Sequence, residues 1–150
     1  MSRDRLYLFD TTLRDGAQTA GVEFSLEDKI GIIDLLEELG VDYVEGGYPG
    51  ANPVDTAFFE KKRTKHATFT AFGMTKRAGR SAANDPGVQG LVHSAATATC
   101  FVAKAWDYQV ELALGSTTEE HLEGLADTVR TAAGAGTEGL VDLERSFDGF

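Results

Sequence analysis

Short runs of apolar residues alternate along this chain with longer stretches whose apolar positions recur at helical spacing. The runs predict five β-strands, at residues 6–9, 41–44, 68–72, 99–103 and 139–143. The longer stretches predict helices at 26–39, 55–62, within 86–94, at 108–114 and at 118–132. The first helix is the clearest, because Ser25 precedes it as an N-cap and Gly40 follows it as a stop. Strands that alternate with helices predict parallel pairing and right-handed βαβ units.

Two α/β architectures fit five strands of this kind. An open, doubly wound sheet is complete within 150 residues, whereas a (β/α)₈ barrel typically needs about 250. Residues 144–150 begin a strand-to-helix loop and supply no helix to cover the fifth strand. We therefore expect the first five β/α units of a truncated (β/α)₈ TIM barrel. Residues 1–150 would then be the N-terminal part of a catalytic domain, with the rest of the barrel and any regulatory domain absent.

Composition narrows the classes of partner. The formal net charge of −10 disfavours nucleic acid, and we expect the basic run at 61–66 to lie at a solvated helix end. Cys100 is the one cysteine, which excludes an intrachain disulfide, and we interpret it as a small buried hydrophobic residue. The chain has no apolar signal segment at its N-terminus and no run long enough to span a membrane. We expect a cytoplasmic protein without a membrane or nucleic-acid partner.

Polar residues collect where the predicted strands end. The C-terminal ends of parallel strands meet at one end of a sheet and carry the functional groups there. The candidates are residues 10–18, Glu45, Lys104, Asp107, Asp142, Glu144 and Asp148. Carboxylates gathered with an arginine and a lysine indicate a divalent cation such as Mg²⁺ or Mn²⁺ and an anionic substrate. Strand-end caps and surface ion pairs are an alternative that residue type alone leaves open.

Residues 10–18, Asp-Thr-Thr-Leu-Arg-Asp-Gly-Ala-Gln, resemble the opening motif of the DRE-type metallolyase barrels. That family includes isopropylmalate, homocitrate and citramalate synthases and hydroxymethylglutaryl-CoA lyase. The resemblance extends along the chain, and residues 43–59, 69–77 and 101–108 are similar to the citramalate synthase branch. It implies the TIM-barrel fold, a divalent metal cofactor (Mg²⁺, Mn²⁺ or Zn²⁺) and acetyl-CoA as co-substrate.

The resemblance also implies a role for each matching residue. Arg14 polarises the keto acid, and Glu144 is the catalytic acid/base. Asp15 is a metal ligand. The substrate-binding residues are expected to be Gln18, Glu45 and Lys104.

The implied reaction is a Claisen-type condensation of acetyl-CoA with a 2-keto acid, which is pyruvate in the citramalate branch. Acetyl-CoA loses a methyl proton, the enolate attacks the ketone, and hydrolysis of the thioester releases the product and CoA. The implied setting is branched-chain amino-acid (isoleucine and leucine) biosynthesis, with a homo-oligomer, a dimer, as the full-length assembly.

The chain departs from the family pattern in its histidines. The His-x-His pair that completes the family's metal site is absent from these residues, and Gln109 and Arg145 stand where the branch has histidines. His66, His93 and His121 lack ligand-like spacing and are expected on the surface or on helices. We therefore expect the isolated chain to be inactive. Two alternatives stay open: an inactive half-barrel or remnant that acts only in association, and a lyase of the same superfamily.

Overall fold

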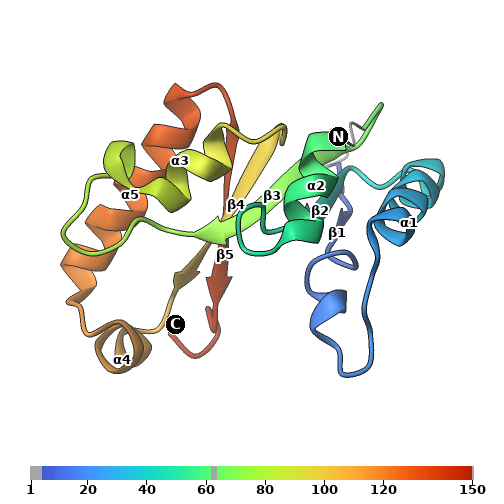
Figure 1. Ribbon diagram of the computed structural model, residues 1–150. Helices are drawn as coiled ribbons and strands as arrows, with labels where there is room; N and C mark the ends of the chain where they lie inside the picture. Colours follow the sequence, from blue (N-terminus) through green and yellow to red (C-terminus); the bar gives the residue numbers. More distant parts are fainter. Residues whose placement is uncertain (1–4, 62–63, 150) are drawn as a thin grey trace.

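The computed structural model describes residues 5–61 and 64–149, and its centre is a parallel sheet (Figure 1). The strands are β1 (Phe9–Asp10), β2 (Tyr43–Gly47), β3 (Thr68–Met74), β4 (Ala98–Lys104) and β5 (Glu138–Glu144). All neighbouring pairs are parallel and follow sequence order, β1-β2-β3-β4-β5. A doubly wound sheet reverses its strand order at a switch point, and this sheet does not. The strand order confirms the prediction of successive units of a (β/α)₈ barrel.

The sheet is curved, and a side-chain contact across its concave face shows the extent of the curvature. The Tyr43 hydroxyl on β2 lies 3.1 Å and 3.3 Å from the two carboxylate oxygens of Glu138 on β5. Two strands separate β2 from β5 in the sheet. The side chains meet because the strands tilt and twist as they do in a barrel, so the described strands form a half-barrel.

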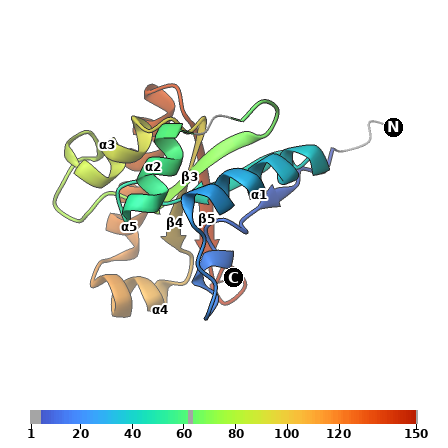
Figure 2. The ribbon, with the colours of Figure 1, turned by 45° about the vertical axis from the view of Figure 1, so that its right-hand side comes forward.

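Helices form the crossovers between the strands. The longer ones are α1 (Leu26–Leu39), α2 (Pro53–Lys61), α3 (Pro86–Val92) and α5 (Thr118–Gly134). Shorter elements are η1 (Gly16–Gln18), η2 (Ala82–Asn84), α4 (Asp107–Gln109) and the π-helical η3 (Val110–Leu114). Figure 1 shows α1 and α2 beside the early strands and α3 and α5 beside the later ones. In Figures 1 and 2 the loop after β1, α4 and the turn after β5 lie at the same end of the sheet, where the arrowheads of β4 and β5 point.

Helix α1 begins and ends where its sequence predicts. The Ser25 hydroxyl accepts a hydrogen bond from the Asp28 N–H, and the Asp28 carboxylate accepts one from the Ser25 N–H, which completes a capping box. Gly40 ends the helix with φ of 86°, a left-handed conformation that glycine adopts without strain. The Val41 N–H then bonds back to the Leu36 carbonyl at 3.3 Å. Val41 therefore belongs to the helix end, and β2 begins later than the predicted residue 41.

Strand β1 is the largest departure from the predicted bounds. It covers Phe9–Asp10 in place of 6–9. The Leu8 carbonyl accepts hydrogen bonds from the N–H groups of Asp42 and Tyr43, but the Leu8 N–H donates to the Asp42 side chain at 2.9 Å. The Asp42 carboxylate thus takes the place of a strand partner for the Leu8 N–H, and the β1 ladder does not extend to Leu8. The preceding residue, Tyr7, is 59% exposed.

The other differences in element bounds are small. Strands β2 to β5 extend beyond the predicted C-terminal ends, by three residues in β2. Helix α2 begins at Pro53, and its predicted end at Lys62, like part of the basic run 61–66, lies outside the described residues. The same holds for residues 1–4 of the N-terminus. The predicted helix 108–114 is divided between α4 and η3. No helix in the described part of the chain is both long and apolar enough to cross a membrane.

Aromatic packing holds β2 and β3 against α2. Phe59 stacks on Phe69 with ring centroids 4.3 Å apart, and Phe58 meets Phe69 edge-on at 5.4 Å. All three side chains are buried, each contributing about 1.5–3 kcal/mol of hydrophobic stabilisation. A Cβ on Gly46 would lie 2.5 Å from the Phe69 ring. Glycine at this position lets β2 approach the aromatic cluster, which fixes the backbone beside Glu45.

Candidate functional site

The predicted site residues gather at the C-terminal end of the strands. Arg14, Asp15, Gln18, Lys104 and Glu144 all line one cavity of about 360 Å³. Glu45 lies beneath them on β2 and joins the group through Arg14. The expectation that these residues share one end of the sheet is therefore met by the geometry. Their chemical roles remain predictions.

Two carboxylates and one aromatic ring hold the Arg14 guanidinium in place. Its Nε donates to the Glu45 carboxylate at 2.6 Å, and its Nη1 donates to the Asp15 carboxylate at 2.9 Å. Its Cζ lies 4.1 Å from the centre of the Phe72 ring, a cation–π distance. The loop after β1 supplies this arginine, with the backbone N–H groups of residues 14, 15 and 16 all directed at the Thr11 carbonyl. The guanidinium is thus fixed in one plane before any ligand arrives, which suits it to bind a planar carboxylate or keto group.

Glu45 is almost fully buried, with 1% of its surface exposed. Burial raises the pKa of its carboxyl group, and the adjacent Arg14 guanidinium partly offsets that rise. Cys100 faces the same carboxylate from β4, and burial raises the pKa of its thiol to about 12, with Glu45 adding to the effect. A thiol with that pKa stays protonated at neutral pH and is a poor nucleophile. The buried position of Cys100 confirms its interpretation as a small core residue.

Lys104 and Glu144 form an ion pair at the edge of the cavity. They are register partners at the C-terminal ends of β4 and β5, so their side chains extend from neighbouring strands on the same face. Both are partly exposed, at 25% and 40% of their side-chain surface. The pair places an ammonium and a carboxylate beside the cavity that Arg14 lines. The cavity can therefore bind an anionic ligand through Arg14 and Lys104, and its Glu144 carboxylate can accept a proton.

Sequence reasoning missed three residues that build this site. Phe72 supplies the face on which Arg14 rests. His121 was expected on the surface or on a helix; it lies on α5 and lines the cavity, with its Nε2 3.0 Å from the Lys104 carbonyl oxygen. Lys29 on α1 is 3% exposed and contacts the backbone beside both Arg14 and Glu45. The position of Phe72 near the end of a predicted strand was a usable signal, whereas a lysine inside a helix ordinarily lies in solvent.

The described residues do not by themselves fit a divalent cation. Asp15 supplies one carboxylate, and its Oδ1 already accepts from Arg14. Within residues 5–61 and 64–149, no group of three or more His, Cys, Asp or Glu side chains is placed to hold a metal ion. Hard cations need about six ligands, several of them from protein. Asp15 is at most one member of a metal site.

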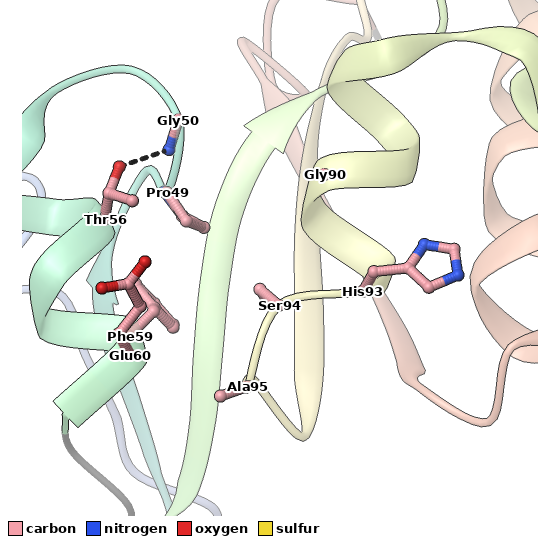
Figure 3. A pocket seen from close by; sticks show the side chains of 9 residues that line it. All are labelled: Pro49, Gly50, Thr56, Phe59, Glu60, Gly90, His93, Ser94 and Ala95. Carbon is pink, nitrogen blue, oxygen red and sulfur yellow. Dashed lines mark hydrogen bonds between the residues drawn. The ribbon is translucent and has the colours of Figure 1, made fainter.

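A larger cavity lies away from this chemistry, between α2 and α3 (Figure 3). Its volume is about 630 Å³, and its lining includes Pro49, Thr56 and Ser94. Figure 3 shows the His93 ring turned away from α2, and His93 is exposed as predicted. The charged pairs described above do not line this cavity, so it forms no part of the candidate site.

Comparison with known proteins defines the class. Residues 5–148 match the HMGL-like family, and the chain belongs to that family. It is 47% identical to an (R)-citramalate synthase of Streptomyces coelicolor over 98% of its length and 42% identical to that of Aquifex aeolicus, also over 98%. It is 35% identical to a homocitrate synthase, AksA, of Methanopyrus kandleri over 86%.

The chain spans only part of each relative. It covers 28% of the two citramalate synthases and 31% of the homocitrate synthase. Among solved structures, the hydroxymethylglutaryl-CoA lyase of Pseudomonas aeruginosa matches 91% of this chain and 45% of its own, with a TM-score of 0.70 and 19% identity. The corresponding lyase of Brucella melitensis matches 93% and 49%, with a TM-score of 0.70 and 16% identity. These likenesses establish the fold, that of the first units of a TIM barrel.

Proposed function

We propose that this chain is the N-terminal part of the catalytic barrel of an acyltransferase that condenses acetyl-CoA with a 2-keto acid, pyruvate in the first instance. The observation that carries the proposal is Arg14, fixed by Glu45, Asp15 and Phe72 on the wall of a cavity that Glu144 also lines. A rigid cation opposite a carboxylate is what condensation of an anionic ketone with a carbon acid requires.

Arg14 is proposed to bind the keto acid and stabilise the charge that develops on its ketone oxygen. Its Nε and Nη1 are occupied by carboxylates, and no hydrogen bond joins Nη2 to the described residues. That edge of the guanidinium is open to donate to a substrate oxygen. The donor is already in place, so little reorganisation accompanies the reaction. Gln18 and Lys104, on the same cavity, would contact the remaining polar atoms of the substrate.

Glu144 is proposed to exchange protons with the reacting carbon acid. In the condensation, a base removes a methyl proton from acetyl-CoA, and the resulting enolate carbon forms a bond to the ketone carbon. The π-electron pair of the ketone moves to its oxygen, and the alkoxide takes up a proton. Water then cleaves the thioester to release CoA and the dicarboxylic acid. The ion pair with Lys104 orients the Glu144 carboxylate toward the cavity shared by both residues. Glu45, buried beneath Arg14, would shape the pocket and not transfer protons.

Two observations favour condensation over the retro-Claisen lyase reaction. The relatives at 47% and 42% identity are synthases by name. The likeness to lyases, at 19% and 16% identity, is a likeness of fold. We further propose that the complete protein is a cytoplasmic dimer that serves isoleucine or leucine biosynthesis.

The lone carboxylate of Asp15 makes the isolated chain a poor catalyst. When bound, a divalent cation would act as a Lewis acid beside the keto acid, and Asp15 is the described residue proposed to ligate it. Residues 5–61 and 64–149 place no group of three or more His, Cys, Asp or Glu side chains to complete such a site. We therefore expect no CoA release from acetyl-CoA and pyruvate by residues 1–150, with or without added Mg²⁺ or Mn²⁺.

A chimera tests the proposal directly. Residues 1–150 would replace the homologous segment of the Streptomyces coelicolor citramalate synthase, to which they are 47% identical. Free thiol released from acetyl-CoA would be followed with pyruvate and, in parallel, with 2-oxoisovalerate and 2-oxoglutarate. We expect pyruvate-dependent release in the chimera. A folded chimera that releases no thiol with any of the three keto acids would overturn the proposal.

A matched pair of variants assigns the role of Arg14 within that chimera. Arg14→Ala should lower turnover by about 100-fold or more, the usual effect of removing one donor that stabilises a developing oxyanion. Arg130→Ala is the control, because Arg130 is exposed on α5 and away from the cavity lining. Equal activity in the two variants would show that Arg14 does not bind the reacting keto acid.

A further inference from the structure

Lys29 is a buried cation at the junction of three elements. It lies on α1, and only 3% of its surface is exposed. Its ammonium donates to the Leu13 carbonyl at 2.8 Å, to the Gly46 carbonyl at 2.9 Å and to the Asp55 carboxylate at 2.5 Å. These three acceptors match the three protons that a lysine ammonium can donate. A buried ammonium is costly unless it is paired and fully hydrogen-bonded, and Lys29 meets both conditions.

The two carbonyls are adjacent in sequence to the site residues. Leu13 immediately precedes Arg14, and Gly46 immediately follows Glu45. Leu13 belongs to the loop after β1, which has no ladder pairing of its own, and Gly46 lies on β2. One ammonium therefore ties the backbone that carries the arginine to the backbone that carries its carboxylate. Lys29 therefore links the two backbone segments whose side chains make the 2.6 Å contact between Arg14 Nε and Glu45 Oε2.

Asp55 anchors the lysine from the other side. Its Oδ2 accepts from the Tyr48 N–H at 2.8 Å, and its own N–H donates to the Asn52 side chain at 2.8 Å. A Cβ on Gly47 would lie 2.5 Å from the Asp55 carboxyl carbon, so only glycine leaves room for the carboxylate. The backbone of β2 thus turns around Asp55, and the aspartate is locked at the start of α2.

We propose that Lys29 and Asp55 form a positioning pair, which holds Arg14 in contact with Glu45 and so presets the guanidinium for its ligand. The pair acts through the backbone and does not line the cavity that Lys104 and Glu144 share. It lines a neighbouring cavity of about 630 Å³ together with Arg14 and Gln18, but its polar atoms are already paired with one another and with the backbone. Its relevance to catalysis rests on the proposed function of Arg14, but its effect on the Arg14–Glu45 contact does not. The alternative is that the pair only stabilises the fold, as many buried ion pairs do, without setting the geometry of the site.

The test measures the Arg14–Glu45 contact by nuclear magnetic resonance and does not depend on enzymatic activity. In protein labelled with ¹⁵N-arginine, the Nε–Hε resonance of Arg14 is identified by its loss in Arg14→Lys. The double variant Lys29→Met with Asp55→Asn removes both buried charges together, so neither is left unpaired, and the amide introduced by Asp55→Asn retains an oxygen for the Tyr48 N–H. We expect its Arg14 resonance to move toward those of exposed arginines. Exchange of that proton with solvent should become about tenfold or more faster, as expected when a charged hydrogen bond is lost.

Controls separate positioning from general stability. Lys61→Met is matched in chemistry and lies on the exposed surface of α2, so it should leave the Arg14 resonance and its exchange rate unchanged. Lys29→Met alone should be less stable than the double variant, because it buries the Asp55 charge without a partner. A folded double variant whose Arg14 resonance and exchange match the parent would overturn the proposal. Unfolding of the double variant would also overturn it, because the pair would then be required for the fold as a whole.

Discussion

Replacing Arg14 by methionine isolates the charge of Glu45 in the protein interior. Methionine keeps apolar contact with the Phe72 ring but cannot donate to the carboxylate 2.6 Å away. Glu45 is 1% exposed, so water cannot substitute for the lost donor. Breaking a buried ion pair from one side costs about 3–5 kcal/mol. Because the Arg14 side chain is itself 14% exposed, we expect the lower end of that range, about 3 kcal/mol at pH 8.

The loss should depend on pH in a defined direction. Burial already raises the pKa of Glu45 above its ordinary value of 4.5, and Arg14 opposes that rise. Without Arg14 the pKa must rise further. A carboxyl whose pKa is raised by folding contributes stability that is complete below its unfolded pKa and is lost as the pH rises through its folded pKa. The destabilisation by Arg14→Met should therefore shrink toward about 1 kcal/mol at pH 4.5, where Glu45 can fold protonated and only a hydrogen bond is missing.

Urea unfolding followed by far-ultraviolet circular dichroism at pH 4.5 and pH 8 measures both values. Domains of this size unfold with about 5–15 kcal/mol, so a loss of 3 kcal/mol leaves a folded baseline. The double variant Arg14→Met with Glu45→Gln removes the charge and should recover most of the loss at pH 8. A destabilisation equal at the two pH values, or no recovery in the double variant, would refute the account of Glu45 as a buried and paired carboxylate.

Two further predictions probe the packing around the sheet. Gly73→Ala should destabilise the protein by about 1–3 kcal/mol, because the new Cβ would lie 2.1 Å from Leu91 Cδ1 on α3. Leu91→Ala frees that space, so the double variant should lose clearly less than the sum of the single losses in urea unfolding; additive losses would contradict the packing. Cys100 should react with Ellman's reagent at neutral pH only as fast as the protein opens, because its thiol is buried and its pKa is raised to about 12. Rapid reaction in buffer that preserves the fold would show that the β4 interior is accessible.

The sequence predicted the fold wherever local signals agreed with one another. Helix α1 has a capping box, helical spacing and a terminal glycine, and the structure follows all three. Strands β3, β4 and β5 are apolar runs that differ from prediction by no more than two residues at either end. The predicted bounds of β1 were wrong because the four apolar residues 6–9 have the pattern of a strand whether or not a neighbouring strand pairs with them. The Asp42 side chain occupies the Leu8 N–H, and no pattern within the run reveals that contact.

The residues of the candidate site likewise fall into those that the sequence predicts and those that it cannot. Arg14, Asp15 and Gln18 lie together in one motif, so the sequence itself places them side by side. Glu45, Lys104 and Glu144 could be added because parallel strands end together. Lys29 could not, because its role depends on which carbonyls lie near it after folding. His121 is similar, since its ring reaches the cavity only when α5 packs beside the end of β4.

The sequential order of the strands bears on how the molecule assembles. Each strand from β2 to β5 pairs with the strand that precedes it in the chain, across a helical crossover. Within the described residues every ladder therefore joins neighbours in sequence, and the sheet can grow by adding strands to a local nucleus. The loops closed in this way are of modest length. The short ladder of Phe9–Asp10 is the weakest part of this sheet, and we expect β2 to β4 to nucleate folding and β1 to dock later, bringing Arg14 into place as one of the last events.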